Sequence, residues 1–150
     1  MKKTVCFALA LFVMTVFVGC GSARDGSALR KLNMITDTFS LSGMGAVYAR
    51  GEKCERELSD ELVARMFSEG GNITAFENVK SCAVFLFRNF SDGEIDVIEL
   101  CDVSHKPEML AVVNRRARKK SGAVVLSRGK YIFLISCDDA EKIADYIRKL

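Results

Sequence analysis

The sequence predicts an α+β domain: a four-stranded antiparallel sheet, made of two hairpins, with helices packed on at least one face. The first observation is that residues 82–87 and 94–102 are strand-like and flank an Asp-Gly pair, which is typical of a hairpin turn. The second is a similar pair of segments, 123–126 and 130–137, around a Ser-Arg-Gly turn. The third is that four other segments carry apolar residues at helical spacing. Their order along the chain indicates a single domain over residues 27–150.

The predicted helices begin at residues that are favoured at helix N-termini. Serine and aspartate can cap a helix, and proline is favoured in a first turn. The predicted starts are Ser27, Ser59, Lys106-Pro107 and Asp138. In the last helix the apolar side chains predict a buried stripe of Ala140, Ile143, Ala144 and Ile147. Residues 41–53, which contain the sequence GMG, are predicted to be a loop.

The first hairpin places two cysteines opposite each other. If residues 90–93 form its loop, Cys82 faces Cys101. Opposed residues of antiparallel strands have Cα atoms about 4.5 or 5.5 Å apart, which a disulfide can span. Two buried free thiols are one alternative, and a two-residue turn at Asp92-Gly93, which shifts the register by two, is another. A Cys82–Cys101 disulfide is therefore one of the outcomes that the sequence leaves open.

Residues 1–19 have the composition of a bacterial export signal. Two lysines precede an apolar stretch over residues 5–18, which is shorter than the about 20 residues of a membrane-spanning helix. The end of this region, Phe17-Val18-Gly19-Cys20, resembles the lipobox of bacterial lipoproteins. The resemblance implies cleavage after Gly19 and attachment of lipid to the thiol of Cys20. An ordinary signal peptide that ends near a cysteine is the alternative.

A lipid anchor at Cys20 implies a place at the cell membrane, on its extracytoplasmic face. The two or three acyl chains on such a cysteine hold a protein stably, whereas one chain holds it marginally. Residues 20–26 are rich in glycine and serine and are predicted to be a flexible linker. Removal of residues 1–19 takes away two lysines and no acid, so the 22 basic and 19 acidic side chains become 20 and 19. This near balance argues against a nucleic-acid partner.

Candidate chemistry is sparse in the sequence. No C-x-x-C motif occurs and His105 is the only histidine, so neither a metal site nor a cofactor is predicted. No Ser or Cys stands at a nucleophile spacing from His105, and a surface or capping role is predicted for it. Four acidic residues on one strand are predicted to be solvated edge charges, with Asp96 and Glu99 on opposite faces. These four are Glu94, Asp96, Glu99 and Asp102.

A basic cluster ends the third predicted helix. It consists of Arg115, Arg116, Arg118, Lys119 and Lys120. Cations at a helix C-terminus complement the helix dipole, and this interpretation is favoured. The alternative is contact with anionic lipid headgroups, to which each cation near the surface would contribute about 1 kcal/mol.

Three segments resemble a family of small uncharacterised lipoproteins of anaerobic Gram-positive bacteria, a domain of unknown function. The segments are SDELVARMFSEG, SCAVFLFRNFSDGEIDVIEL and GKYIFLISCDDAEKIADYIRKL, behind a lipobox. The resemblance covers most of residues 26–150. This chain departs from the family at RRARKKSGAVV, where the family carries a longer, acidic insertion. The resemblance implies no activity and no binding residue.

The sequence therefore predicts a lipid-anchored extracytoplasmic module that binds or scaffolds an unidentified protein at the cell envelope and is not catalytic. A sheet and helices are predicted, but no assembled catalytic set. The alternative is an envelope hydrolase or redox enzyme that uses His105 with Asp138 and Asp139, or the cysteines. Convergence of His105 and carboxylates in a pocket would favour the enzyme, and an exposed apolar surface would favour the binding module.

Overall fold

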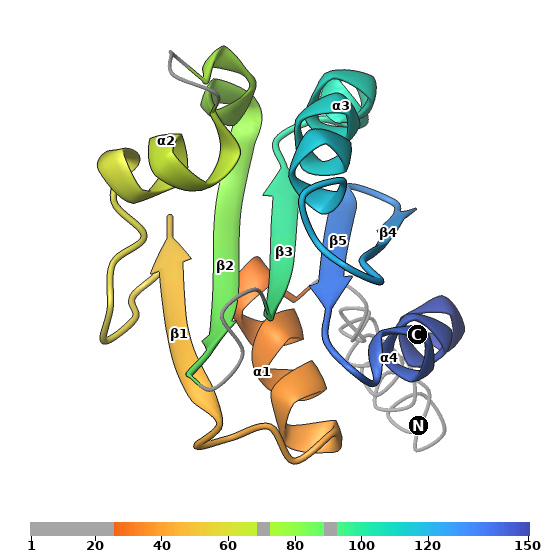
Figure 1. The fold of residues 1–150 in the computed structure, drawn as a ribbon. Coiled ribbons are helices and arrows are strands. Elements are labelled where there is room, and N and C mark those ends of the chain that lie inside the picture. Colours follow the sequence, from red (N-terminus) through yellow and green to blue (C-terminus); the bar gives the residue numbers. More distant parts are fainter. Residues whose placement is uncertain (1–25, 69–72, 89–92) are drawn as a thin grey trace, which may run out of the picture.

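The computed structural model describes residues 26–68, 73–88 and 93–150 and has an α+β fold. Its antiparallel sheet has five strands in the order β1-β2-β3-β5-β4 (Figure 1). The strands are β1 (Gly45–Arg50), β2 (Val79–Phe87), β3 (Glu94–Leu100), β4 (Val124–Arg128) and β5 (Tyr131–Ser136). The predicted α+β class is confirmed, with one strand more than the four predicted.

The additional strand, β1, lies within residues 41–53, so the prediction of a loop there is wrong. Its sequence, GAVYAR, lacks the alternation of large apolar and polar residues that marks a half-buried strand. β1 pairs along its whole length with β2. A Cβ at Gly45 would clash with the carbonyl oxygen of Leu86 and the ring of Phe85, so glycine is required for this close approach.

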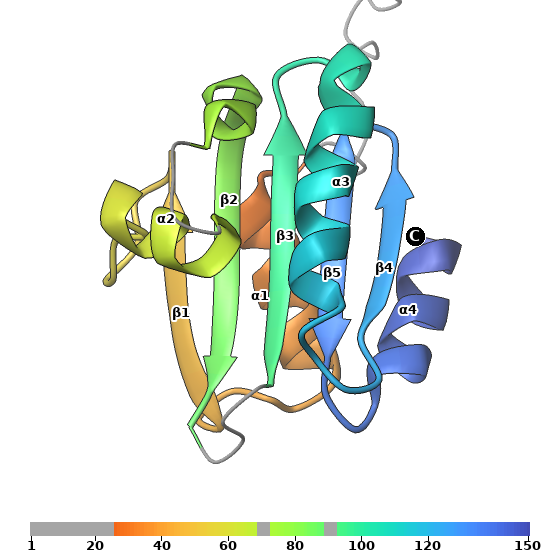
Figure 2. The same cartoon turned by 45° about the horizontal axis from the view of Figure 1, so that its top comes forward.

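Helices cover both faces of the sheet. They are α1 (Ala28–Thr38), α2 (Asp60–Phe67), α3 (Lys106–Ala117) and α4 (Ala140–Lys149), with the short 3-10 helices η1 (Thr74–Asn78) and η2 (Val103–His105). The helices α1 and α4 pack on one face, and α2, α3 and η1 pack on the other. Figure 2 shows α2 and α3 in front of the sheet and α1 behind it. Each face therefore has its own apolar core, and β3 and β5 are buried on both sides.

Most of the predicted helix starts are confirmed. Ser27 accepts a hydrogen bond from the N–H of Arg30 at 3.3 Å, and Ser59 accepts one from Leu62 at 3.2 Å. Pro107 lies in the first turn of α3. The prediction that Asp138 caps the last helix is wrong, because α4 begins at Ala140 and follows Asp139. The predicted buried stripe of α4 is confirmed: Ala140, Ile143, Ala144 and Ile147.

The register between β2 and β3 differs from the predicted one. Cys82 lies opposite Ile98, not opposite Cys101, which follows the end of β3 and is exposed. Cys82, by contrast, is fully buried, and the described cysteines are all free thiols: Cys54, Cys82, Cys101 and Cys137. Both strands carry apolar residues on both faces, so a shift by an odd number of residues still places apolar side chains opposite one another. The hydrophobic pattern alone could not exclude the wrong register.

Some predictions concern residues that the structure does not describe. The predicted export signal with Gly19, the lipidated Cys20 and most of the predicted linker precede residue 26. Most of the predicted loop of the first hairpin, residues 90–92, also lies outside the described residues. Within the described ranges, no helix is both long and apolar enough to cross a bilayer.

Candidate functional site

A pocket of about 570 Å3 lies between α1, α4 and the start of β5. We call it the α1–α4 groove. The residues that line it include Lys31, Met34, Arg128, Tyr131, Phe133 and Ile147. Sites that bury small ligands usually have volumes of about 300–1,000 Å3, so the groove is large enough to hold one.

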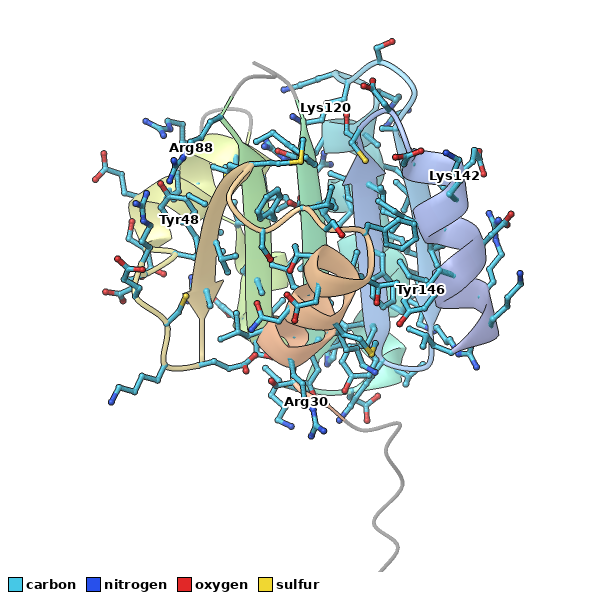
Figure 3. The ribbon with its side chains drawn as sticks, turned by 90° about the horizontal axis from the view of Figure 1, so that it is seen from below. Arg30, Tyr48, Arg88, Lys120, Lys142 and Tyr146 are labelled. Carbon is cyan, nitrogen blue, oxygen red and sulfur yellow. The ribbon has the colours of Figure 1, made fainter. Side chains whose placement is uncertain are left out.

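The two helices converge at one end of the groove. The rings of Phe39 on α1 and Tyr146 on α4 meet edge to face, with centroids 5.7 Å apart. The hydroxyl groups of Thr38 and Tyr146 lie 3.3 Å apart at the same place. In Figure 3, Tyr146 lies between α1 and α4, while Arg30 marks the other end of α1. The groove lies beside this contact, because Met34 on α1 and Ile147 on α4 are among the residues that line it.

The inner wall of the groove is apolar. Phe133 and Ile147 are buried residues of the core on this face of the sheet. Met34 is half-buried, and Val103, which is 52% exposed, adds apolar surface at the mouth. An apolar ligand in the groove would remove this surface from water, which is favourable at about 25 cal/mol per Å2.

Three cations line the rim of the groove, and each is held by contacts with the protein. The Nζ atom of Lys31 lies 4.4 Å from the centroid of the Tyr131 ring. Arg128 donates to the carbonyl oxygens of Ile147 and Arg148, at 3.1 and 2.6 Å, and so satisfies the C-terminal end of α4. The third cation, Lys130, forms an ion pair with Glu99.

Glu99 is a buried carboxylate that fixes Lys130 and Tyr131. Ser81 donates to Glu99 at 2.8 Å, and Lys130 and Lys80 approach it at 2.9 and 3.1 Å. Burial alone would raise the pKa of Glu99, but the hydrogen bonds from Lys130, Ser81 and Lys80 outweigh burial and lower it. The charge of Glu99 is therefore retained, and it holds Lys130 beside the groove.

The groove borders the point where the described chain begins. The hydroxyl of Tyr131 donates a hydrogen bond to the carbonyl oxygen of Gly26 at 2.6 Å. Gly26 stands directly before Ser27, the N-cap of α1, and ends the predicted linker to Cys20. A ligand in the groove would therefore sit beside the end of that linker, at Gly26.

Sequence reasoning missed the groove. Its residues come from α1, the η2 turn, the β4–β5 hairpin and α4, which are far apart in the chain. The only sequence signal was that residues 130–137 are apolar on both faces, which predicts a covered strand but not a gap between the covering helices.

The predicted basic cluster is divided in the structure. Arg116 forms a two-point ion pair with Glu94 and also donates to the carbonyl oxygen of Met66 at 2.5 Å. Lys120 lies 3.1 Å from the same carboxylate. The other three cations are exposed: Arg115, Arg118 and Lys119. Contact of the cluster with lipid headgroups stays a prediction, and Arg116 and Lys120 already have buried partners.

The acidic residues of β3 are not solvated edge charges, and that prediction is wrong. Glu94, Asp96 and Glu99 are all buried because β3 is the central strand of the sheet. Only Asp102, which follows the strand, is exposed. As predicted, Asp96 and Glu99 lie on opposite faces, toward α3 and toward α1.

Asp96 lies beneath α3 and has no hydrogen-bond partner for an ionised carboxylate among the described residues. Burial raises its pKa well above the ordinary value, and the charge of Glu94 raises it further, while Arg116 and Lys120 lower it. A protonated Asp96 can donate to Glu94. The nearby pocket of about 350 Å3 is lined by Glu94 but not by Asp96, so Asp96 does not reach solvent there.

The residues of the predicted alternative enzyme do not converge. In the β3–β5 ladder Glu94 pairs with Ser136, so Asp138 and Asp139 follow β5 at the Glu94 end of the sheet. His105 follows β3 at the opposite end, beyond the pair of Glu99 and Tyr131. In the described part of the chain, no three histidine, cysteine or acidic side chains are grouped as a metal site would need.

Comparison of the chain with protein-family models, with curated proteins and with solved structures gives no match. The resemblance to small lipoproteins of anaerobic Gram-positive bacteria therefore stays a prediction from the sequence segments that carry it.

Proposed function

We propose that the protein is a lipid-anchored binding module at the extracytoplasmic face of the cell membrane, and that the α1–α4 groove is its ligand site. The observation that carries the proposal is the position of the groove beside Gly26. The linker from that residue leads to Cys20, the cysteine of the lipobox-like sequence.

The groove supports binding better than catalysis. It combines a buried apolar wall with a cationic rim, and ligand sites are commonly apolar with a few placed polar groups. No aspartate or glutamate is among the described residues that line the groove, and Glu99, the partner of Lys130, is buried in its own ion pairs. His105, Asp138 and Asp139 lie at opposite ends of the sheet, which disfavours the enzyme that would use them together.

Cross-linking in the producing cells tests the proposal. A photoreactive benzophenone amino acid replaces Met34 in the groove, and in a matched control it replaces Arg115 on the opposite side of the sheet. We expect membrane-fraction protein with the probe at position 34 to yield a discrete adduct that position 115 does not yield. Equal adduct patterns at the two positions would contradict the assignment of the groove as the ligand site.

The anchor is tested separately with Cys20→Ala. This change removes the only thiol that the lipobox-like sequence offers, so the protein should leave the fraction of stably anchored membrane proteins. An unchanged membrane fraction after a carbonate wash would contradict the anchor while leaving the groove open as a binding site.

A further inference from the structure

We infer that the α1–α4 groove binds one anionic phospholipid of the membrane in which the protein is anchored. The phosphate would lie at the cationic rim, and the first part of an acyl chain would lie on the apolar wall. This inference rests on the proposed function, because it takes Cys20 as the anchor. The inference specifies the ligand of the same groove.

The chemistry of the groove matches an anionic amphiphile. Three cations line the rim: Lys31 lies over the Tyr131 ring, Arg128 donates to the end of α4, and Lys130 pairs with Glu99, which offsets its charge. Phosphate oxygens accept hydrogen bonds from lysine and arginine, and charge-assisted bonds of this kind are strong. Free phosphate would leave the wall formed by Phe133 and Ile147 uncovered, whereas a phospholipid would cover it.

The position of the groove brings it within reach of membrane lipid. Five residues separate Cys20 from Gly26, and the six Cα-to-Cα steps between the two span at most about 22 Å when the chain is fully extended. Because Tyr131 lines the groove and holds Gly26, the groove cannot move far from an anchored Cys20. Phospholipids are the amphiphiles that surround such an anchor at the highest local concentration.

The position of Gly26, which is hydrogen-bonded to Tyr131, favours the groove over the basic cluster as the side that faces lipid. The cluster lies at the end of α3, on the side of the sheet opposite α1 and α4. Two of its cations, Arg116 and Lys120, bind the buried carboxylate of Glu94. The two sides cannot face one flat membrane at the same time. Lipid contact at the groove and lipid contact at the basic cluster therefore exclude each other.

The test uses the full-length lipidated protein, purified and reconstituted at low density into vesicles. One set of vesicles is phosphatidylcholine with a small fraction of phosphatidylglycerol, and the other is phosphatidylcholine alone. The probe is the benzophenone amino acid at position 34 or, as the control, at position 115, and adducts are identified by mass spectrometry. Thermal unfolding of each variant checks that the fold is unchanged.

We expect a phosphatidylglycerol adduct at position 34, several-fold above that at position 115. Lys31→Ala should weaken lipid binding about fivefold, because each cation near an anionic surface contributes about that factor. Lys31→Arg should retain it, and Arg118→Ala should not change it.

Four results in the vesicle experiment would overturn the inference. They are the absence of a lipid adduct at position 34, equal yields at the two positions, equal yields with and without phosphatidylglycerol, and an adduct with the lipid of Cys20 itself. A protein adduct at position 34 in cells, without any phospholipid adduct, would also overturn the inference. That last result would leave the proposed binding module standing.

Discussion

Asp96 and Glu99 lie on the same central strand and are both buried, but their surroundings differ. Glu99 faces α1 and receives hydrogen bonds from Ser81, Lys80 and Lys130. Asp96 faces α3, and the Nε atom of Arg116 lies 3.8 Å away, beyond hydrogen-bond distance. The pKa of Glu99 is lowered and the pKa of Asp96 is raised.

The difference shows that burial alone does not decide the charge of a buried carboxyl group. Desolvation favours the neutral form of both residues, and only Glu99 has enough donors to reverse it. On the α1 side the charge is kept and positions Lys130 at the groove. On the α3 side Arg116 and Lys120 pair with Glu94, and burial favours the protonated form of Asp96.

Removal of the Arg116 side chain should cause the largest loss of unfolding free energy. Arg116→Ala takes the two-point partner from the buried Glu94 and a cation from the neighbourhood of Asp96. Loss of one partner of a buried ion pair costs about 3–5 kcal/mol, and we expect about 3 because Lys120 remains. Urea unfolding of the unlipidated mature chain, with Cys20→Ser, measures it at pH 7.

The matched control for this change is Arg115→Ala. Arg115 is the neighbouring residue on α3 and is exposed, so the expected change in unfolding free energy is within about 0.5 kcal/mol. Comparable losses for the two variants would show that the buried ion pair does not stabilise the α3 side.

Glu99→Gln should destabilise the protein by about 2 kcal/mol, because it weakens charge-assisted hydrogen bonds to a buried group. The folded pKa of Glu99 is below its ordinary value of 4.5, so its contribution is present above that pH and is lost as the pH falls through the folded pKa. Unfolding free energies measured from pH 7 to pH 3 should fall less steeply in the variant. An identical slope would contradict the assigned lowering of the pKa.

Asp96→Asn should change the free energy of unfolding in the opposite direction, and by the smallest amount of the three changes. The folded pKa of Asp96 is above its ordinary value of 3.8, so the folded state binds more protons, and stability falls as the pH rises from that value toward the folded pKa. An amide mimics the protonated acid. The variant should therefore be more stable than the wild type at pH 7.

The pH dependence separates this account from a simple packing effect. Wild-type stability should decline relative to that of Asp96→Asn as the pH rises from about 4 toward the raised folded pKa of Asp96, and the stabilities of the two proteins should converge at the acidic end of the range. A destabilised variant at pH 7, with a constant difference at all pH values, would show that Asp96 is ionised in the fold.

Local signals in the sequence predicted most of the helices and the α+β class. Ser27 and Ser59 cap their helices as expected, because a cap depends on residues only three positions apart. The buried apolar face of α4 was also predicted correctly, because the spacing of its apolar residues lies within one helix.

Long-range features were not predictable in the same way. β1 is fixed by its pairing with β2 and by the close approach at Gly45, which no local pattern reveals. Strand β3 carries acids among its apolar residues, which is typical of an edge, and its burial depends on β5 pairing on its other side. The groove likewise depends on how α1 and α4 diverge from the contact between Phe39 and Tyr146. Packing between distant segments decides all three.

The central claim is that Cys20 carries the lipid that holds the groove beside the membrane. Mass spectrometry of the protein extracted from the membranes of producing cells tests it most directly. We expect an N-terminal peptide that begins at Cys20 and carries a thioether-linked diacylglyceryl group, and a chain that begins at another residue or carries no fatty acid would contradict the lipid anchor.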